Sequence, residues 1–165
     1  DGSGDGQVLR YNNTVAGFSF GVSMEQGGAG DGSAADDITG VGVKYSTDMS
    51  GMGIAVGLGM QDGGTGEEAS GASVKVTSGA MTFIVNSSEV TRAGVETSNT
   101  SLGFGYTMNA LTVGVNWGEN ETAGVKTDGT GVAVNYDLGG GMVAQFGANS
   151  GDGDDTMSAG LGLSF

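Results

Sequence analysis

The feature that most constrains the fold of this chain is an alternation of apolar residues with small or polar residues, repeated along its length. In "TVAGFSFGVSME", residues 14–25, one set contains Ala16, Phe18 and Phe20, and the other contains Val15 and Ser19. "GMGIAVGLGMQD", residues 51–62, repeats the pattern. Successive side chains of a β-strand point to opposite faces, so a period of two predicts strands with one apolar and one small polar face.

The pattern predicts about eleven strands and an all-β, up-and-down antiparallel sheet. The last expected strand, "TMSAGLGLSF", keeps its alternation through Phe165. The expected strands lie around residues 9–11, 14–25, 41–45, 51–62, 74–76, 81–85, 102–108, 111–117, 132–138, 142–148 and 156–165.

The connections between these segments alternate between short and long. Short links are expected near residues 13–14 and at 47–51, 77–80, 107–110 and 137–141, and long links at 25–37, 62–70, 87–100, 118–129 and 149–155. Alternate connections of an up-and-down sheet lie at the same end, so one rim should carry short turns and the other long, acid-rich loops.

Composition excludes several function classes. The 19 acidic and five basic residues give a net charge of -14, which argues against nucleic acid as a partner, because binding phosphates needs clustered Lys and Arg. The chain has no Cys and no His, which removes thiolate and imidazole catalysis and the usual zinc sites. No catalytic residues are assigned, no cofactor is required, and we expect no enzymatic activity.

Three features place the apolar face against lipid. Tyr45, Tyr106 and Tyr136 precede short turns, and Phe165 ends a strand at the same rim, as aromatic residues do at a membrane interface. Trp117 lies near the opposite rim and fits a second aromatic girdle. The apolar stripes match a hydrocarbon slab of roughly 25 Å, and the other face is too small and polar to close a dry core.

Backbone polar groups are not left unpaired in lipid, so such a sheet should close into a transmembrane β-barrel. Single-chain bacterial barrels have an even number of strands, whereas eleven is odd. We therefore expect residues 1–165 to be a single, incomplete barrel portion that lacks the N-terminal strands. The missing portion or another copy should cover the sheet edges.

The tail "GVAVNYDLGGGMVAQFGANSGDGDDTMSAGLGLSF" and the earlier "VLRYNNTVAGFSFGVSM" resemble the alphaproteobacterial general porins. These are trimeric outer-membrane barrels of about sixteen strands, and the resemblance covers about strands six to sixteen. It implies location in the bacterial outer membrane, passive diffusion of small hydrophilic solutes and ions, contact with lipid and lipopolysaccharide, a homotrimer and external calcium sites. It also implies that the constriction loop belongs to the missing N-terminal portion.

Polar residues on the small face are candidates to line a pore. The phase of the alternation puts Arg10 opposite Leu9 and Tyr11, and gives Lys44 and Lys75 the same orientation. The functional interpretation is a cationic group that orients solutes across a transverse field, and the alternative is solvated charges on a wet face. The full set of expected lining residues is Arg10, Lys44, Gln61, Lys75, Asn116, Asn135 and Gln145.

The acidic loops suggest Ca²⁺, which prefers clustered oxygen ligands. The "SGDGDD" segment supplies Asp152, Asp154 and Asp155, and a second candidate is Asp36 with Asp37. Neither has the full twelve-residue pattern of a helix-loop-helix site, so a solvated acidic loop is the alternative.

Two other functions stay open at this point. A secreted calcium β-roll or adhesin is also rich in Gly and Asp, although no fixed nine-residue repeat occurs here. A filament made by pairing of sheet edges would use the same strands without a channel.

Overall fold

The computed structural model describes residues 8–26, 37–64 and 66–164, and every structural statement below refers to these residues. They form eleven strands: β1 (Val8–Val15), β2 (Phe18–Glu25), β3 (Ile38–Met49), β4 (Met52–Asp62), β5 (Glu68–Ser78), β6 (Met81–Arg92), β7 (Val95–Met108), β8 (Leu111–Thr122), β9 (Val125–Gly139), β10 (Met142–Gly151) and β11 (Thr156–Leu163). No helix in this part of the chain is long and apolar enough to cross a membrane.

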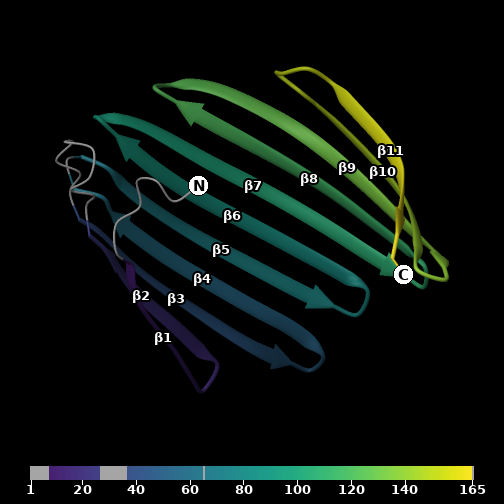
Figure 1. Ribbon diagram of the computed structural model, residues 1–165, viewed down its shortest axis with the longest axis horizontal. Coiled ribbons are helices and arrows are strands. Elements are labelled where there is room, and N and C mark those ends of the chain that lie inside the picture. The colour runs from purple at the N-terminus through teal and green to yellow at the C-terminus, as the bar shows by residue number, and fades with distance from the viewer. Residues whose placement is uncertain (1–7, 27–36, 65, 165) are drawn as a thin grey trace.

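The strands form one sheet in chain order, and every neighbouring pair is antiparallel (Figure 1). This confirms the predicted all-β, up-and-down architecture and its eleven strands. A calcium β-roll winds its strands in parallel turns, so the antiparallel pairing contradicts that alternative.

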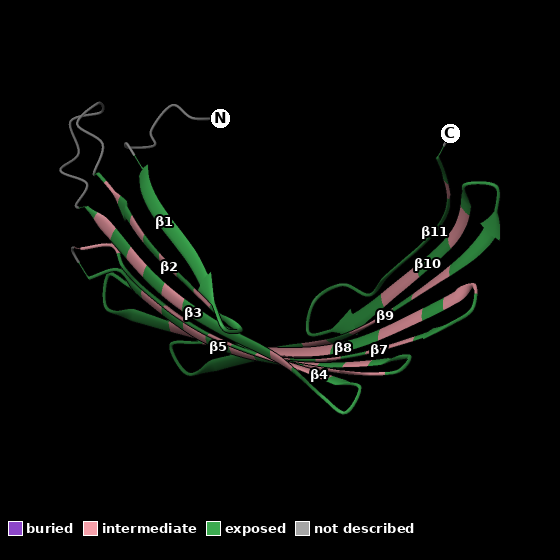
Figure 2. Ribbon diagram, turned by 90° about the horizontal axis from the view of Figure 1, so that it is seen from below, coloured by how far each residue is buried: buried purple, intermediate pink, exposed green. Residues whose placement is uncertain are grey.

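The sheet is curved into an open trough, with β1 and β11 at its two margins (Figure 2). These two strands do not pair with each other, so the sheet is not closed. Each margin has a neighbour on one side only, which leaves main-chain donors and acceptors along its free edge.

The first turn lies later in the chain than the sequence predicts. The link expected near residues 13–14 is formed by Ala16 and Gly17, so Val15 pairs with Phe18 and lies on the apolar face rather than the polar one. Ala16 and Gly17 have φ values of 50° and 85°. Positive φ at both central residues is the mark of a type I′ hairpin turn, whose twist matches that of the flanking strands. Ala16 and Gly17 continue the alternation of apolar and small residues, so the sequence pattern does not indicate a turn at this position.

Two of the expected long loops are tight hairpins. Residues 87–100 contain a two-residue turn at Ala93 and Gly94, and residues 118–129 contain another at Ala123 and Gly124, each with positive φ at both positions. The ladder continues up to these turns, since Arg92 pairs with Val95 across the first and Thr122 pairs with Val125 across the second. These strands extend past their apolar stripe with polar side chains, which composition alone does not distinguish from a loop.

The sheet has no interior of its own. None of the described residues is buried, and large apolar side chains such as Leu161 and Met60 remain 68% and 66% exposed. One layer of strands cannot cover both of its faces. The apolar side chains therefore need a surrounding that the described residues do not supply.

Candidate pore wall

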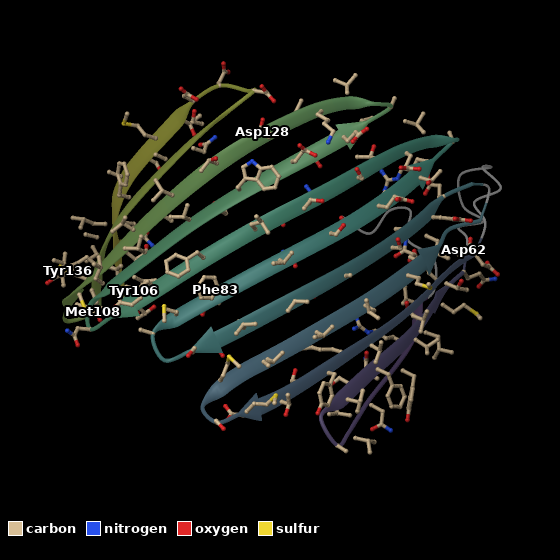
Figure 3. All side chains as sticks on the ribbon, turned by 180° about the vertical axis from the view of Figure 1, so that it is seen from behind. Asp62, Phe83, Tyr106, Met108, Asp128 and Tyr136 are labelled. Carbon is tan, nitrogen blue, oxygen red and sulfur yellow. The ribbon has the colours of Figure 1, made fainter. Side chains whose placement is uncertain are left out.

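The small polar face is the concave face of the trough. Two hollows lie on it, of about 790 Å³ over β1–β6 and about 570 Å³ over β7–β11. Polar residues of one phase line them, including Arg10, Lys44 and Gln61 in the first and Asn116 and Asn120 in the second. The convex face carries the other phase, with Phe83, Tyr106, Met108 and Tyr136 visible from that side (Figure 3).

All seven residues predicted to line a pore belong to the alternate positions whose side chains lie on the concave face. The register aligns Lys44 with Gly57 and Ser73, Lys75 with Ala55, and Arg10 with Ser23. Asn116 pairs with Gly131, while Asn135 pairs with Gln145. The strands thus bring the predicted set to one face. Contact of these seven residues with a solute stays a prediction.

Charge is distributed unevenly over this face. Arg10, Lys44 and Lys75 lie on β1, β3 and β5, and none of these three cations forms an ion pair with a described carboxylate. Arg10 donates from Nε to Oδ1 of Asn12 at 3.1 Å. Carboxylates of the same phase, Glu25, Asp48 and Asp137, are confined to strand ends. Arg92, at the loop end of β6, was not singled out from the sequence, although its phase indicates the same orientation.

The β6–β11 part of the concave face is lined by amides and hydroxyls. Asn99 Nδ2 donates to Oδ1 of Asn120 at 3.0 Å, and Gln145 Nε2 donates to Oδ1 of Asn135 at 3.2 Å. Asn86 donates to Ser101 Oγ at 3.3 Å. These cross-strand contacts satisfy part of each amide and leave other polar atoms directed to the trough. This half of the wall is therefore polar and nearly neutral.

The predicted aromatic girdle lies on the convex face. Tyr45, Tyr106 and Tyr136 are near the short-turn rim, and the rings of Tyr45 and Phe18 are 4.4 Å apart between centroids. Trp117 lies nearer the opposite rim on β8, where its Nε1 donates to Asp128. Phe165 lies outside the described residues. Aromatic side chains thus mark both margins of the apolar stripe, as expected at the two interfaces of a membrane.

An acidic band borders the apolar stripe on the long-loop side of the convex face, where Figure 3 shows Asp62 and Asp128. Lys126 lies in this band and contacts Glu119 at 2.8 Å and Glu121 at 3.5 Å. The hydrogen bond that Lys126 Nζ donates to Glu119, followed by the charges of Glu119 and Glu121, raises the pKa of Lys126 above its ordinary value. Sequence reasoning missed this cluster, because residues 118–129 look like a loop without a face.

The candidate calcium ligands are only partly brought together. Asp152 Oδ2 accepts the backbone N–H of Asp128 at 2.8 Å, and the Asp152 N–H donates to the Asp128 carbonyl at 3.0 Å. Within the described ranges, no three acidic side chains converge as a metal site would require. Asp36 lies outside these ranges, as do residues 27–35 of the same long link. Calcium binding at Asp152, Asp154 and Asp155 stays a prediction.

Comparisons with known proteins agree with this geometry. The family model described as Gram-negative porin matches residues 1–156. Among curated protein sequences, none matches the chain.

Several solved structures share the fold. A porin refined at 1.8 Å is 21% identical with a TM-score of 0.70, and the match covers 94% of this chain and 60% of that porin. A triple mutant of Rhodopseudomonas blastica porin is 17% identical with a TM-score of 0.71, covering 96% and 55% of the two chains. Salmonella typhi OmpF, in a complex with daunomycin, is 15% identical with a TM-score of 0.70, covering 94% and 60%. The chain thus spans less than two thirds of the length of these proteins.

Proposed function

This chain belongs to the Gram-negative porin family, its place is the bacterial outer membrane, and we propose that it forms part of the wall of a water-filled pore. Small hydrophilic solutes and ions would cross this pore by passive diffusion. The observation that carries the proposal is the two-faced sheet, with a convex apolar face that no described residue covers and a concave polar face.

The two faces follow from the physics of a membrane. Lipid removes the convex apolar side chains from water, at about 25 cal/mol per Å² of apolar surface. The concave side chains are too small and polar to pack against another layer, so water is their natural neighbour. We assign Arg10, Lys44, Gln61, Lys75, Asn116, Asn135 and Gln145 to the lining of the pore.

The proposed barrel needs further strands. The sheet is open between β1 and β11, and unpaired edges are not stable in lipid. We propose that residues 1–165 supply one portion of the barrel and that strands from the rest of the full-length protein cover both edges. Assembly into trimers, with lipid and lipopolysaccharide around them, is the corresponding proposal for the complete protein.

Conductance tests the channel directly. The full-length protein that contains this chain, reconstituted in planar bilayers, should give stepwise conductance in KCl and heat-modifiable migration from detergent. A folded, inserted protein that adds no conductance would contradict the proposal. Filaments without conductance would favour the alternative of edge-paired assembly.

Neighbouring cysteine variants test which face lines the pore, since the chain has no Cys. Asn116 and Val115 are adjacent on β8 and lie on opposite faces. A charged, membrane-impermeant thiol reagent should modify Asn116→Cys and change its single-channel conductance, whereas Val115→Cys should stay unmodified. Modification of Val115→Cys alone would reverse the assignment of the faces.

A further inference from the structure

The larger hollow of the concave face has a floor without side chains. The register aligns Gly21, Gly42, Gly59 and Gly71 across four consecutive strands, β2 to β5. All four line the hollow of about 790 Å³. Glycine inside a strand often marks close approach of a ligand or of another backbone. The absence of Cβ atoms in this row makes room beside longer side chains.

Polar side chains line both sides of this floor. The row on the long-loop side contains Arg10, Ser23 and Gln61, and the row on the short-turn side contains Ser19, Lys44 and Ser73. With about 4.8 Å between strands and about 3.3 Å per residue, the Cα atoms of Arg10 and Lys44 lie about 16 Å apart. Both side chains are long enough to reach over the glycine row from opposite sides.

The charge of the hollow is positive although the chain as a whole has a net charge of -14. Arg10 and Lys44 line it, and no carboxylate from the described part of the chain does. Neither cation has a described ionic partner. A guanidinium and an ammonium that lack ionic partners among the described residues, on two sides of a flat floor, are complementary to a solute with negative charge at both ends.

We propose that this hollow is a binding subsite for small elongated solutes with an anionic oxygen group at each end, such as short dicarboxylates. Arg10 binds one carboxylate through its planar fork, and Lys44 attracts the other as a point charge. Hydroxyl and amide groups of Ser23, Gln61 and Ser73 contact the polar atoms between them. The subsite rests on the proposed function, since it operates inside the pore.

Block of the chloride current by succinate tests the subsite in the full-length porin in planar bilayers. Succinate should reduce the current at lower concentration than propionate, which has one carboxylate, and succinamide, which has none, should not block. Arg10→Gln and Lys44→Gln should each raise the half-blocking concentration of succinate about tenfold, equivalent to about 1.4 kcal/mol.

Two further variants separate a local site from a general effect of charge. Lys126→Gln removes one positive charge from the convex face, where Lys126 contacts Glu119, and should leave the succinate block unchanged. Gly59→Val keeps the charge and fills the floor. An added Cβ at Gly59 meets only the Val41 carbonyl at 3.8 Å, so the fold should accept it and succinate block should weaken.

Different results would contradict the proposed pore and the proposed subsite. No KCl conductance from any variant contradicts the proposed pore. Normal conductance, with equal succinate block in the parent, Arg10→Gln and Lys44→Gln proteins, overturns the subsite alone. Equal block by succinate and propionate also overturns it, because the subsite requires two anionic ends.

Discussion

Trp117 of β8 donates a hydrogen bond from its indole Nε1 to Oδ2 of Asp128 on β9, at 3.2 Å. The backbone of Asp128 is held in turn by Asp152, through reciprocal contacts of 2.8 and 3.0 Å. One aspartate therefore links an interfacial aromatic residue of the convex face to the acidic turn between β10 and β11.

Removing the side chain of Asp128 should weaken this corner of the sheet. Asp128→Ala loses the acceptor for Trp117 and should lower the free energy of unfolding by about 0.5–1.5 kcal/mol, as is typical of a hydrogen bond. Asp128→Asn retains an oxygen acceptor and is the matched control, with a smaller loss. Urea unfolding of the full-length porin in lipid vesicles measures both. Equal stability of the parent and Asp128→Ala proteins would show that the contact contributes nothing.

The cost of a new charge should depend on the face and on the depth within the apolar stripe. Val134→Arg, in the middle of the apolar stripe of β9, should cost about 2–4 kcal/mol, and Thr130→Arg, beyond the stripe, about 0–1 kcal/mol. Ala133→Arg lies on the concave face and should leave folding nearly unchanged while altering ion selectivity. Vesicle unfolding and reversal potentials test the series. A large folding cost for Ala133→Arg, with none for Val134→Arg, would contradict the orientation of the sheet.

Replacing Ala123 should stabilise the hairpin between β8 and β9. Ala123 has a φ of 50°, a left-handed conformation that costs most residues roughly 1–2 kcal/mol. Ala123→Asn should recover about 1 kcal/mol, because Asn-Gly is a preferred pair in type I′ turns. Ala80→Asn is the control, since Ala80 is a turn residue without positive φ. The prediction fails if the two variants change the unfolding midpoint alike.

Calcium should bind the turn between β10 and β11 if its acidic residues act as ligands. Asp152→Asn removes a negative charge yet retains an oxygen to accept the Asp128 N–H, so the turn should keep its shape. We expect weaker Ca²⁺ affinity for this variant in isothermal titration of the full-length porin. Identical heats for the parent and variant proteins would remove Asp152 from the ligand set. Glu121→Gln, on the neighbouring hairpin, serves as a charge-matched control.

The strands could be predicted because each face of the sheet meets a different environment. The alternation of Met52, Ile54 and Val56 with Gly53 and Ala55 is present in the sequence and reappears on the two faces of β4. The alternation also predicts which residues share a face, and the residues expected to line a pore, such as Asn116, lie together on the concave face. The predicted antiparallel topology is confirmed, although the links between β6 and β7 and between β8 and β9 are two-residue turns rather than long loops.

Turn positions could not be predicted in the same way. At Ala16 and Gly17 the residues fit the strand pattern, and only their positive φ reveals the turn. At residues 118–129, polar side chains continue the β8–β9 ladder outside the apolar stripe, so their composition resembles that of a loop. The ion pair of Lys126 with Glu119 depends on this register and was missed for the same reason.

The lack of any buried residue in the described sheet has a consequence for how the sequence can diverge. A protein core is close-packed, and a change in the volume of one side chain disturbs its neighbours. In the proposed membrane setting, fluid lipid adapts to the shape of each convex residue, so Leu, Val, Phe or Met can replace one another with little loss. The fold then constrains polarity at each position more than it constrains shape. This tolerance explains how chains only 15–21% identical can retain the same sheet.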